Sequence, residues 1–157
     1  MDVFLSTFHR AAESDPAAHR HLSIFSRCVE PDDPVILVTR CTRPGQPMAG
    51  SHHLLLTRRR LVVVQRTWPL RRQRLHLNTN LRHLSNVTWR ADVDRPGFEL
   101  AVTVMDGIRE RFRLRLGDEV AVAETEESLR GIFLGKRGEP APARKSRTVS
   151  SSVPVLA

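Results

Sequence analysis

The sequence predicts a mainly β (α+β) domain with one or two N-terminal helices, seven strands and one C-terminal helix. Short β-branched runs, separated by charged or Gly/Pro-containing turns, fill the middle of the chain. Apolar residues recur at helical spacing near both ends. The chain has 157 residues, of which 40% are apolar, enough for a core in one domain of ordinary size.

Two helices are predicted before the first strand. Residues 1–14 place Phe4 and Phe8 at helical spacing, with Asp2 at the end where the helix dipole favours an acid. Residues 17–29 follow Pro16 and form the second candidate. We expect the first helix to pack on its own domain. The alternative is that it lies on an anionic membrane.

Five short strands are predicted next, at residues 35–41, 53–57, 61–65, 75–80 and 87–92. The first three are rich in Val, Leu and Ile, and the last two alternate apolar with polar residues. Arg58, Arg59 and Arg60 separate the second and third strands. This pattern predicts a β-hairpin with a positively charged tip.

The last two strands form the clearest predicted hairpin, over residues 98–105 and 108–116. Asp106-Gly107 between them is typical of a type I′ turn. The period of two places one apolar face on the second strand and a stripe of arginines on the other. The stripe consists of Arg109, Arg111, Arg113 and Arg115.

A C-terminal helix is predicted from Asp118, which is a plausible N-cap. Glutamates gather in its first half, where the helix dipole favours them. Val122, Leu129, Ile132 and Phe133 form an apolar stripe suited to closing a sheet or barrel. After Gly135 the composition changes to Lys, Arg, Pro, Ala and Ser, which predicts a disordered basic tail.

The charge of the chain is concentrated in its middle. Residues 34–91 contain eleven arginines and neither Asp nor Glu, and the formal net charge of the whole chain is +8. A guanidinium group binds carboxylate or phosphate through two parallel hydrogen bonds. The acid-free segment therefore indicates an anionic partner.

Three segments resemble the pleckstrin homology (PH) superfold, and in particular the PH-like and GRAM-like domains common in bacteria. Leu54–Val64 is similar to its strand-turn-strand with an L-T-x-x-R-L core, Leu81–Trp89 to the entry to its next strand, and Phe98–Phe112 to its closing hairpin. The resemblance implies a bent sheet or barrel of seven strands closed by the C-terminal helix. It also implies a binding module whose loops engage lipid headgroups or peptides.

The predicted domain boundaries follow from this resemblance: a helical extension at 1–33, a PH-like domain at 34–135 and a tail at 136–157. In lipid-binding members, basic residues cluster in the loop between the first two strands. Here that loop, at 42–51, offers Arg43 and no lysine. This departure weighs against a phosphoinositide site.

No catalytic constellation is evident in the sequence. Cys28 and Cys41 lack C-x-x-C spacing and are expected to be small buried hydrophobes. His52 and His53 are adjacent on a strand and point to opposite faces, so they cannot share one metal ion. We expect no enzyme activity, no cofactor and no metal.

The hairpin tip, the connection at 68–72 and the arginine stripe are the candidate binding surface. Trp68 and Leu70 among arginines suit an anionic interface. The candidate residues are Arg58, Arg59, Arg60, Trp68, Arg71, Arg72, Arg74, Arg109, Arg111, Arg113 and Arg115. A protein or peptide is the favoured partner. An anionic membrane and nucleic acid are the alternatives, the latter weakened by the scarcity of aromatic residues.

Self-association is a further hypothesis, since the acidic C-terminal helix of one molecule could meet the arginines of another. The N-terminus shows no secretory signal pattern and no segment reaches 18 apolar residues. The sequence thus predicts a soluble cytoplasmic protein, with peripheral attachment to the inner membrane face as the alternative. The segment Arg144–Ser152 is a candidate for phosphorylation.

Overall fold

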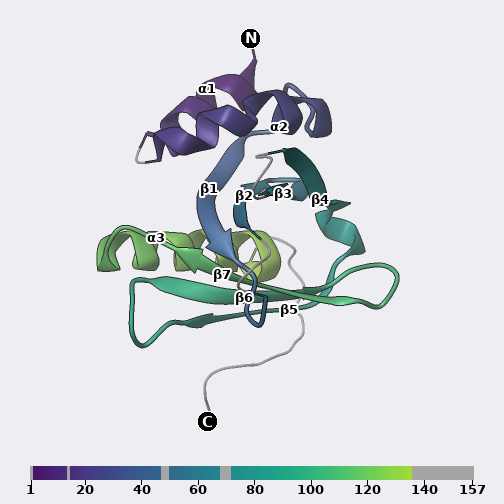
Figure 1. Cartoon of the computed structure of the whole chain (residues 1–157). Coiled ribbons are helices and arrows are strands. Elements are labelled where there is room, and N and C mark those ends of the chain that lie inside the picture. Colours follow the sequence, from purple (N-terminus) through teal and green to yellow (C-terminus); the bar gives the residue numbers. More distant parts are fainter. Residues whose placement is uncertain (1, 14, 47–49, 68–71, 136–157) are drawn as a thin grey trace. The chain divides into compact units, whose positions relative to one another are not determined.

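The computed structural model describes residues 2–13, 15–46, 50–67 and 72–135 (Figure 1). The chain divides into two compact units, Met1–Val122 and Ala123–Ala157, and each is described by itself. The first unit contains the N-terminal helices and every strand. None of the helices in the described residues is both long enough and apolar enough to cross a membrane.

The N-terminal segment forms helix α1 (Val3–Ala11), the 3₁₀ helix η1 (Pro16–His21) and helix α2 (Leu22–Cys28). Asp2 caps α1, because its carboxylate accepts a hydrogen bond of 2.9 Å from the Leu5 backbone N–H. The second predicted helix is divided into a 3₁₀ helix and an α-helix, η1 and α2. Proline, which lacks the backbone N–H, stands at its first position, where a helix tolerates it.

Seven strands form one antiparallel sheet, in the order β4-β3-β2-β1-β7-β6-β5, which confirms the predicted strand count. A short 3₁₀ helix, η2 (Leu81–His83), joins β4 to β5. The strands are β1 (Val35–Thr42), β2 (Ser51–Thr57), β3 (Arg60–Arg66), β4 (Gln73–Asn80), β5 (Ser85–Ala91), β6 (Gly97–Thr103) and β7 (Arg109–Arg115).

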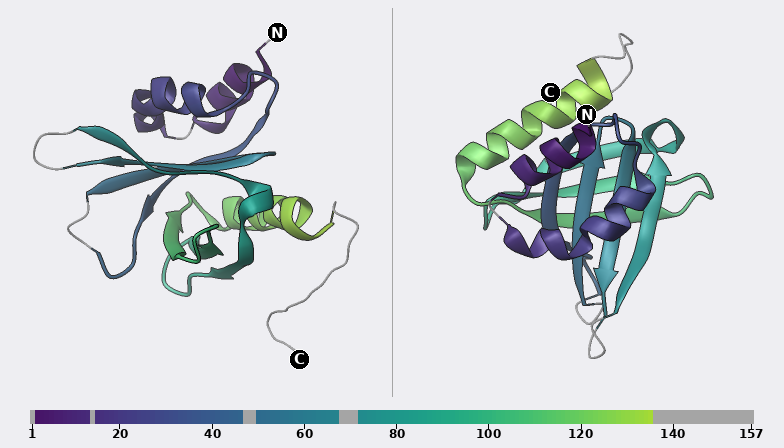
Figure 2. Two further views of the ribbon diagram at one scale, coloured as in Figure 1. Left: turned by 90° about the vertical axis from the view of Figure 1, so that its right-hand side faces the viewer. Right: turned by 90° about the horizontal axis from the view of Figure 1, so that it is seen from above.

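Strand β1 connects two layers of this sheet. It pairs with β2 from Val35 to Cys41, but with β7 only at Cys41 and Thr42. Figure 2 shows the consequence: β5, β6 and β7 run across β1–β4 instead of continuing their plane. The sheet is therefore bent at the C-terminal end of β1.

The N-terminal helices cover the outer face of the β1–β4 layer (Figure 2). Phe4 and Phe8 of α1 and Phe25 of α2 pack with side chains of β1, β2 and β3 in one buried cluster. This confirms that the first helix packs on its own domain. It also explains why Leu54–Leu56 and Leu61–Val64 are buried throughout, since alternate side chains enter the core on each face of the layer.

A buried carboxylate anchors the end of the N-terminal extension to the β2–β3 turn. The Thr57 hydroxyl donates a hydrogen bond of 2.6 Å to Asp33 Oδ2, and both residues are fully buried. The same hydroxyl accepts from the backbone N–H groups of Arg59 and Arg60. In the described part of the chain, Thr57 is the only hydrogen-bond partner of the Asp33 side chain.

Substitution of Thr57 by valine is expected to destabilise the protein by about 2–3 kcal/mol, because it leaves a buried carboxylate unpartnered. Thr57→Ser keeps the hydroxyl and is the matched control, with an expected loss of about 1 kcal/mol for the missing methyl. Urea denaturation at neutral pH measures both. A Thr57→Val variant as stable as the unmodified protein would show that the hydrogen bond to Asp33 contributes nothing.

The closing hairpin is confirmed, but its turn differs from the prediction. The Gly107 N–H donates to the Val104 carbonyl at 2.9 Å, and Val104 N–H donates to the Ile108 carbonyl at 3.0 Å. Of the two predicted turn residues, only Gly107 has a positive φ, at +87°. A type I′ turn needs positive φ at both central residues, so the connection is a longer turn that ends in a left-handed glycine.

The C-terminal helix α3 (Glu119–Arg130) is confirmed, and the boundary between the two units falls inside it. Asp118 is its N-cap, accepting a hydrogen bond of 2.9 Å from the Ala121 N–H. Leu129 is buried, and Glu126 forms an ion pair of 2.9 Å with Arg130 one turn later. A π-helical turn, η3 (Gly131–Gly135), follows. The predicted tail at 136–157 lies outside the described residues.

Candidate functional site

The two positive loops predicted from the sequence lie at opposite ends of the β3–β4 ladder. Arg60 pairs with Asn80 at one end, and Arg66 pairs with Gln73 at the other. Seven residues of strand separate the ends, which is roughly 20 Å. The hairpin tip and the β3–β4 connection therefore do not form one continuous site.

One of the three arginines at the hairpin tip is neutralised by the N-terminal extension. Arg59 forms a two-pronged ion pair with Asp32, with distances of 3.0 and 3.2 Å. The hydrogen bond from Arg59 holds the pKa of Asp32 below its ordinary value. Arg60 donates to Asn78 Oδ1 at 3.0 Å, whereas Arg58 is exposed. In the described residues, Arg59 is thus paired with an acid, Arg60 is held by an amide, and Arg58 has no carboxylate at ion-pair distance.

The arginine stripe on β7 points outward as predicted, but three of its four members bind their own sheet. Arg109 donates to Thr103 at 2.9 Å, to Thr88 at 3.1 Å and to the Asn86 carbonyl.

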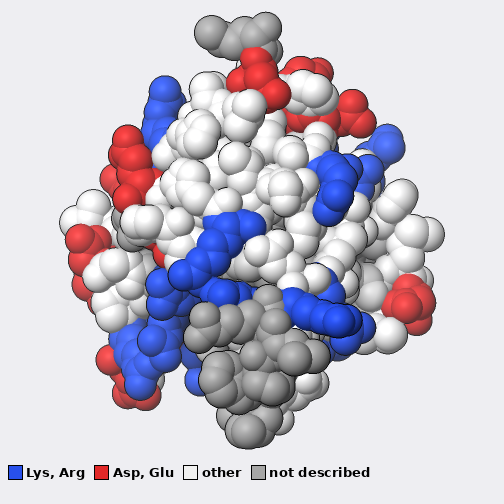
Figure 3. Space-filling view, turned by 45° about the horizontal axis from the view of Figure 1, so that its top comes forward, with Lys and Arg blue, Asp and Glu red and all other residues white. Residues whose placement is uncertain are grey.

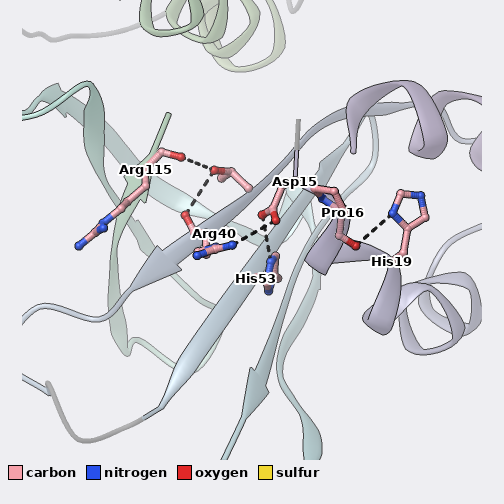
Figure 4. Close-up of polar contacts among 7 residues, drawn as sticks. Asp15, Pro16, His19, Arg40, His53 and Arg115 are labelled. Carbon is pink, nitrogen blue, oxygen red and sulfur yellow. Dashed lines mark hydrogen bonds and ion pairs between the residues drawn. The ribbon is translucent and has the colours of Figure 1, made fainter. Parts of the chain in front are cut away.

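Arg111 donates to Glu99 at 2.8 Å, and Arg113 lies 3.9 Å from Asp92. Arg115 makes no ion pair within the described residues, and its carbonyl accepts from Thr39 at 2.7 Å (Figure 4). The stripe thus cross-links β5, β6 and β7 more than it offers charge to a partner.

Four arginines belong to the segments that meet at the opposite end of the ladder: Arg20 of η1, Arg66 of β3, Arg72 just before β4 and Arg74 within β4. We call these four residues the basic end. Gln73 Nε2 donates to the Arg20 carbonyl at 2.8 Å, which joins η1 to β4. Thr67 N–H donates to the Arg72 carbonyl at 2.8 Å, which closes the connection between β3 and β4.

The basic end keeps most of its charge unpaired. Within the described ranges, no carboxylate lies at ion-pair distance from Arg20, Arg72 or Arg74, and all three are exposed. Figure 3 shows Lys and Arg side chains gathered in the lower half of one face, with acids mainly at its margins. Trp68 and Arg71, also predicted for this site, lie outside the described residues.

Sequence reasoning missed Arg20 at this site, because no local pattern indicates that η1 folds beside β4.

Gly50 marks a close approach of two backbone segments next to Arg66. Its φ is +88°, and a Cβ atom there would lie 2.5 Å from the Arg66 carbonyl oxygen. Only glycine fits this position without a backbone shift. The β1–β2 loop can therefore enter β2 directly beside Arg66.

A second polar cluster links the N-terminal extension to the outer face of the sheet (Figure 4). Asp15 accepts hydrogen bonds from His53 Nε2 at 3.1 Å and from Arg40 at 3.4 Å. Burial opposes ionisation of Asp15, but His53 and Arg40 outweigh it and hold its pKa below the ordinary value. The buried His21 ring lies 4.7 Å from His53, and burial together with His53 lowers the pKa of His21 to about 4.

A third cluster lies on the inner face of the bent sheet. Glu110 Oε1 accepts from His76 at 3.1 Å and from Arg43 at 3.4 Å. This explains why an acid occupies the apolar face of β7. The buried His52 ring lies 5.9 Å from His76, and burial lowers the pKa of His52 to about 4. His52 and His53 thus belong to different faces, as predicted.

The two cysteines are not poised for nucleophilic chemistry. Cys41 is buried and its pKa is raised by burial, and burial also raises the pKa of the half-buried Cys28. Both thiols are therefore poorly ionised at neutral pH. In the part of the chain that the structure describes, no three potential metal ligands come together.

Comparison with known proteins gives fold-level neighbours only. No protein-family model matches the sequence, and no curated protein matches it significantly. Solved structures that are similar include the complex of PDZ-RhoGEF DH/PH domains with GTP-γ-S-activated RhoA, at 19% identity and a TM-score of 0.46 over 81% of this chain and 35% of that chain.

Two other neighbours are the activated truncation of Vav1 and the truncated linker-DH/PH domains of p115-RhoGEF. They have 13% and 18% identity, TM-scores of 0.41 and 0.40, and cover 82% and 78% of this chain. This chain spans little more than a third of each of the three neighbours. The similarity assigns no activity or partner to this protein.

Proposed function

We propose that this protein is a non-enzymatic interaction module whose basic end binds an acidic segment of a protein partner. One observation carries the proposal: Arg20, Arg72 and Arg74 come from two different segments, are exposed and have no carboxylate at ion-pair distance in the described chain. The other predicted arginines mostly bind acids or hydroxyls of the protein itself. Free guanidinium groups are suited to bind carboxylates in pairs.

An acidic protein segment fits this surface better than nucleic acid. The exposed large apolar side chains of the described residues are aliphatic, without any aromatic ring on which a base could stack. Among the described residues next to Arg74, the exposed large apolar side chain is Leu75, which is held in a strand and is 45% exposed. We therefore favour an acidic protein segment, with a membrane as an outcome of the test below.

Charge reversal at the basic end tests this function. The variant Arg72→Glu/Arg74→Glu is expected to bind a fluorescein-labelled, glutamate-rich peptide on the order of tenfold more weakly than the unmodified protein, since about 1.4 kcal/mol corresponds to that factor. Fluorescence anisotropy at low and high salt measures the affinity. The difference should shrink at high salt, because exposed charges are screened.

Arg82→Glu/Arg95→Glu is the matched control, because it changes the net charge equally at two exposed arginines without ion pairs in the described residues. It is expected to retain most of the affinity. Equal weakening by both double variants would show that only net charge matters, and would overturn a site at the basic end. Selective binding of anionic vesicles or of an oligonucleotide over the peptide would assign the partner to that class instead.

A further inference from the structure

An exposed pair of histidines joins α1 to η1. His9 Nδ1 lies 3.3 Å from His19 Nε2, and the two ring planes are inclined by 23° with their centroids 5.3 Å apart. The two residues are ten positions apart in the chain, so the pairing arises only when the N-terminal segment folds back on itself. His19 directly precedes Arg20 in η1, but neither histidine takes part in the proposed function.

The remaining hydrogen bond of His19 defines which nitrogen carries its proton. His19 Nδ1 lies 3.3 Å from the Pro16 carbonyl, as Figure 4 shows, and a carbonyl oxygen can only accept. Nδ1 of His19 is therefore protonated, and its Nε2 presents a lone pair to His9. A metal-binding histidine typically has this arrangement, in which the second nitrogen donates to a backbone carbonyl and fixes the ring.

Both imidazole rings are also held in place by the core. The buried Phe8 ring makes edge contacts with His19 at 5.5 Å and with His9 at 6.0 Å between centroids. The two nitrogens are consequently positioned by α1, by the Pro16 carbonyl and by Phe8, while the outer sides of the rings remain exposed to solvent. A ligand can reach them without opening the core.

The distance between the two nitrogens suits a shared metal ion. Two imidazole nitrogens that lie 2.0–2.1 Å from one tetrahedral Zn²⁺ are separated by about 3.3 Å. We propose that His9 and His19 form a binding site for a divalent transition-metal cation of the Zn²⁺ and Cu²⁺ class, with water in the remaining positions. On binding, the proton on His9 Nδ1 moves to Nε2 through solvent, so that both rings stay neutral and each offers one lone pair.

Copper binding by the full chain, purified without a polyhistidine tag, tests the site. Titration with Cu²⁺ alone, followed by electron paramagnetic resonance, is expected to give one equivalent bound with hyperfine coupling to two imidazole nitrogens. Loss of an outer-shell partner alone costs roughly 10–100-fold in metal affinity. His9→Ala and His19→Ala each remove a direct ligand, so each is expected to weaken binding at least as much and to abolish the two-nitrogen signal.

His83→Ala is the matched control, because His83 is an exposed histidine in a 3₁₀ helix away from this pair. It should bind copper like the unmodified protein. His9→Gln and His19→Gln provide second variants that keep side-chain bulk, and thermal melts without metal confirm that each variant folds. Copper should raise the melting temperature of the unmodified protein and of His83→Ala only. Unchanged affinity in the His9 and His19 variants, or dependence on only one of them, would overturn the site.

Discussion

Replacement of Phe8 by alanine is expected to destabilise the protein by about 3–5 kcal/mol, the usual cost of truncating a buried phenylalanine. The Phe8 side chain is fully buried, and its ring lies 5.8 Å from Phe4 and 6.0 Å from Phe25. It therefore joins α1 to α2 as well as to the sheet. Chemical denaturation at neutral pH measures the effect.

Leu5→Ala is the matched control for this prediction, because Leu5 lies on the same helix but is 36% exposed. It is expected to cost less than about 1.5 kcal/mol, since little apolar surface is lost from the core. Similar losses for the two variants would mean that the N-terminal helices are an appendage that unfolds independently. A single transition with a large loss only for Phe8→Ala would show that they belong to one folding unit with the sheet.

Acidification is expected to produce the second large effect, through buried histidines. In the unfolded chain their pKa is near 6.5, whereas burial lowers the pKa of His21 and of His52 to about 4 in the folded protein. Between pH 6.5 and about 4 the unfolded state thus binds protons that the folded state does not, so stability falls as the pH falls. Burial also lowers the pKa of His53, although Asp15 opposes the shift.

The positively charged groups around these rings also lower the pKa of His21 and of His52. His21 faces His53, Arg66 and Arg20, and His52 faces His76 and Arg43, with Glu110 as the one opposing charge. With about 1.4 kcal/mol per pKa unit, each of the two histidines contributes on the order of 3 kcal/mol that is present at pH 7 and lost by pH 4.

Urea denaturation at a series of pH values between 7.5 and 4.5 measures this dependence. The slope near pH 5 should correspond to about two protons in the unmodified protein, and to about one in His52→Gln. His83→Ala, which removes an exposed histidine, should leave the slope unchanged. A stability that is flat over this range would show that these rings are hydrated or protonated in the folded state.

The strands and helix ends could be predicted because their signals are local. Alternating or β-branched runs gave all seven strands, and Asp2 and Asp118 are helix caps because a short acidic side chain can accept a backbone N–H there. The hairpin was also predictable from Asp106-Gly107, although only Gly107 adopts the left-handed conformation. Local preference determined where the turn falls, but not its type.

The partners of the charged residues could not be predicted, because they depend on long-range packing. Arg59 meets Asp32 across 27 positions, and Glu110 meets Arg43 across 67. The same limit applies to the site. From the sequence, the hairpin tip and the β3–β4 connection were expected to form one site. The strand pairing places them at opposite ends of the ladder, and the backbone of Arg20 lies beside β4 instead.

The acid-free segment also has a consequence for how the protein is made. Its neutralising acids come from both sides in the chain: Asp15 and Asp32 precede it, and Glu99 and Glu110 follow it. A nascent chain in which the closing hairpin has not yet been synthesised therefore carries the arginines of residues 34–91 but lacks Glu99 and Glu110. Arg43 and Arg90 can meet their acidic partners only after that hairpin has been made. The last hairpin thus completes the sheet and also supplies acidic partners to arginines made before it, although its own four arginines outnumber its three acids.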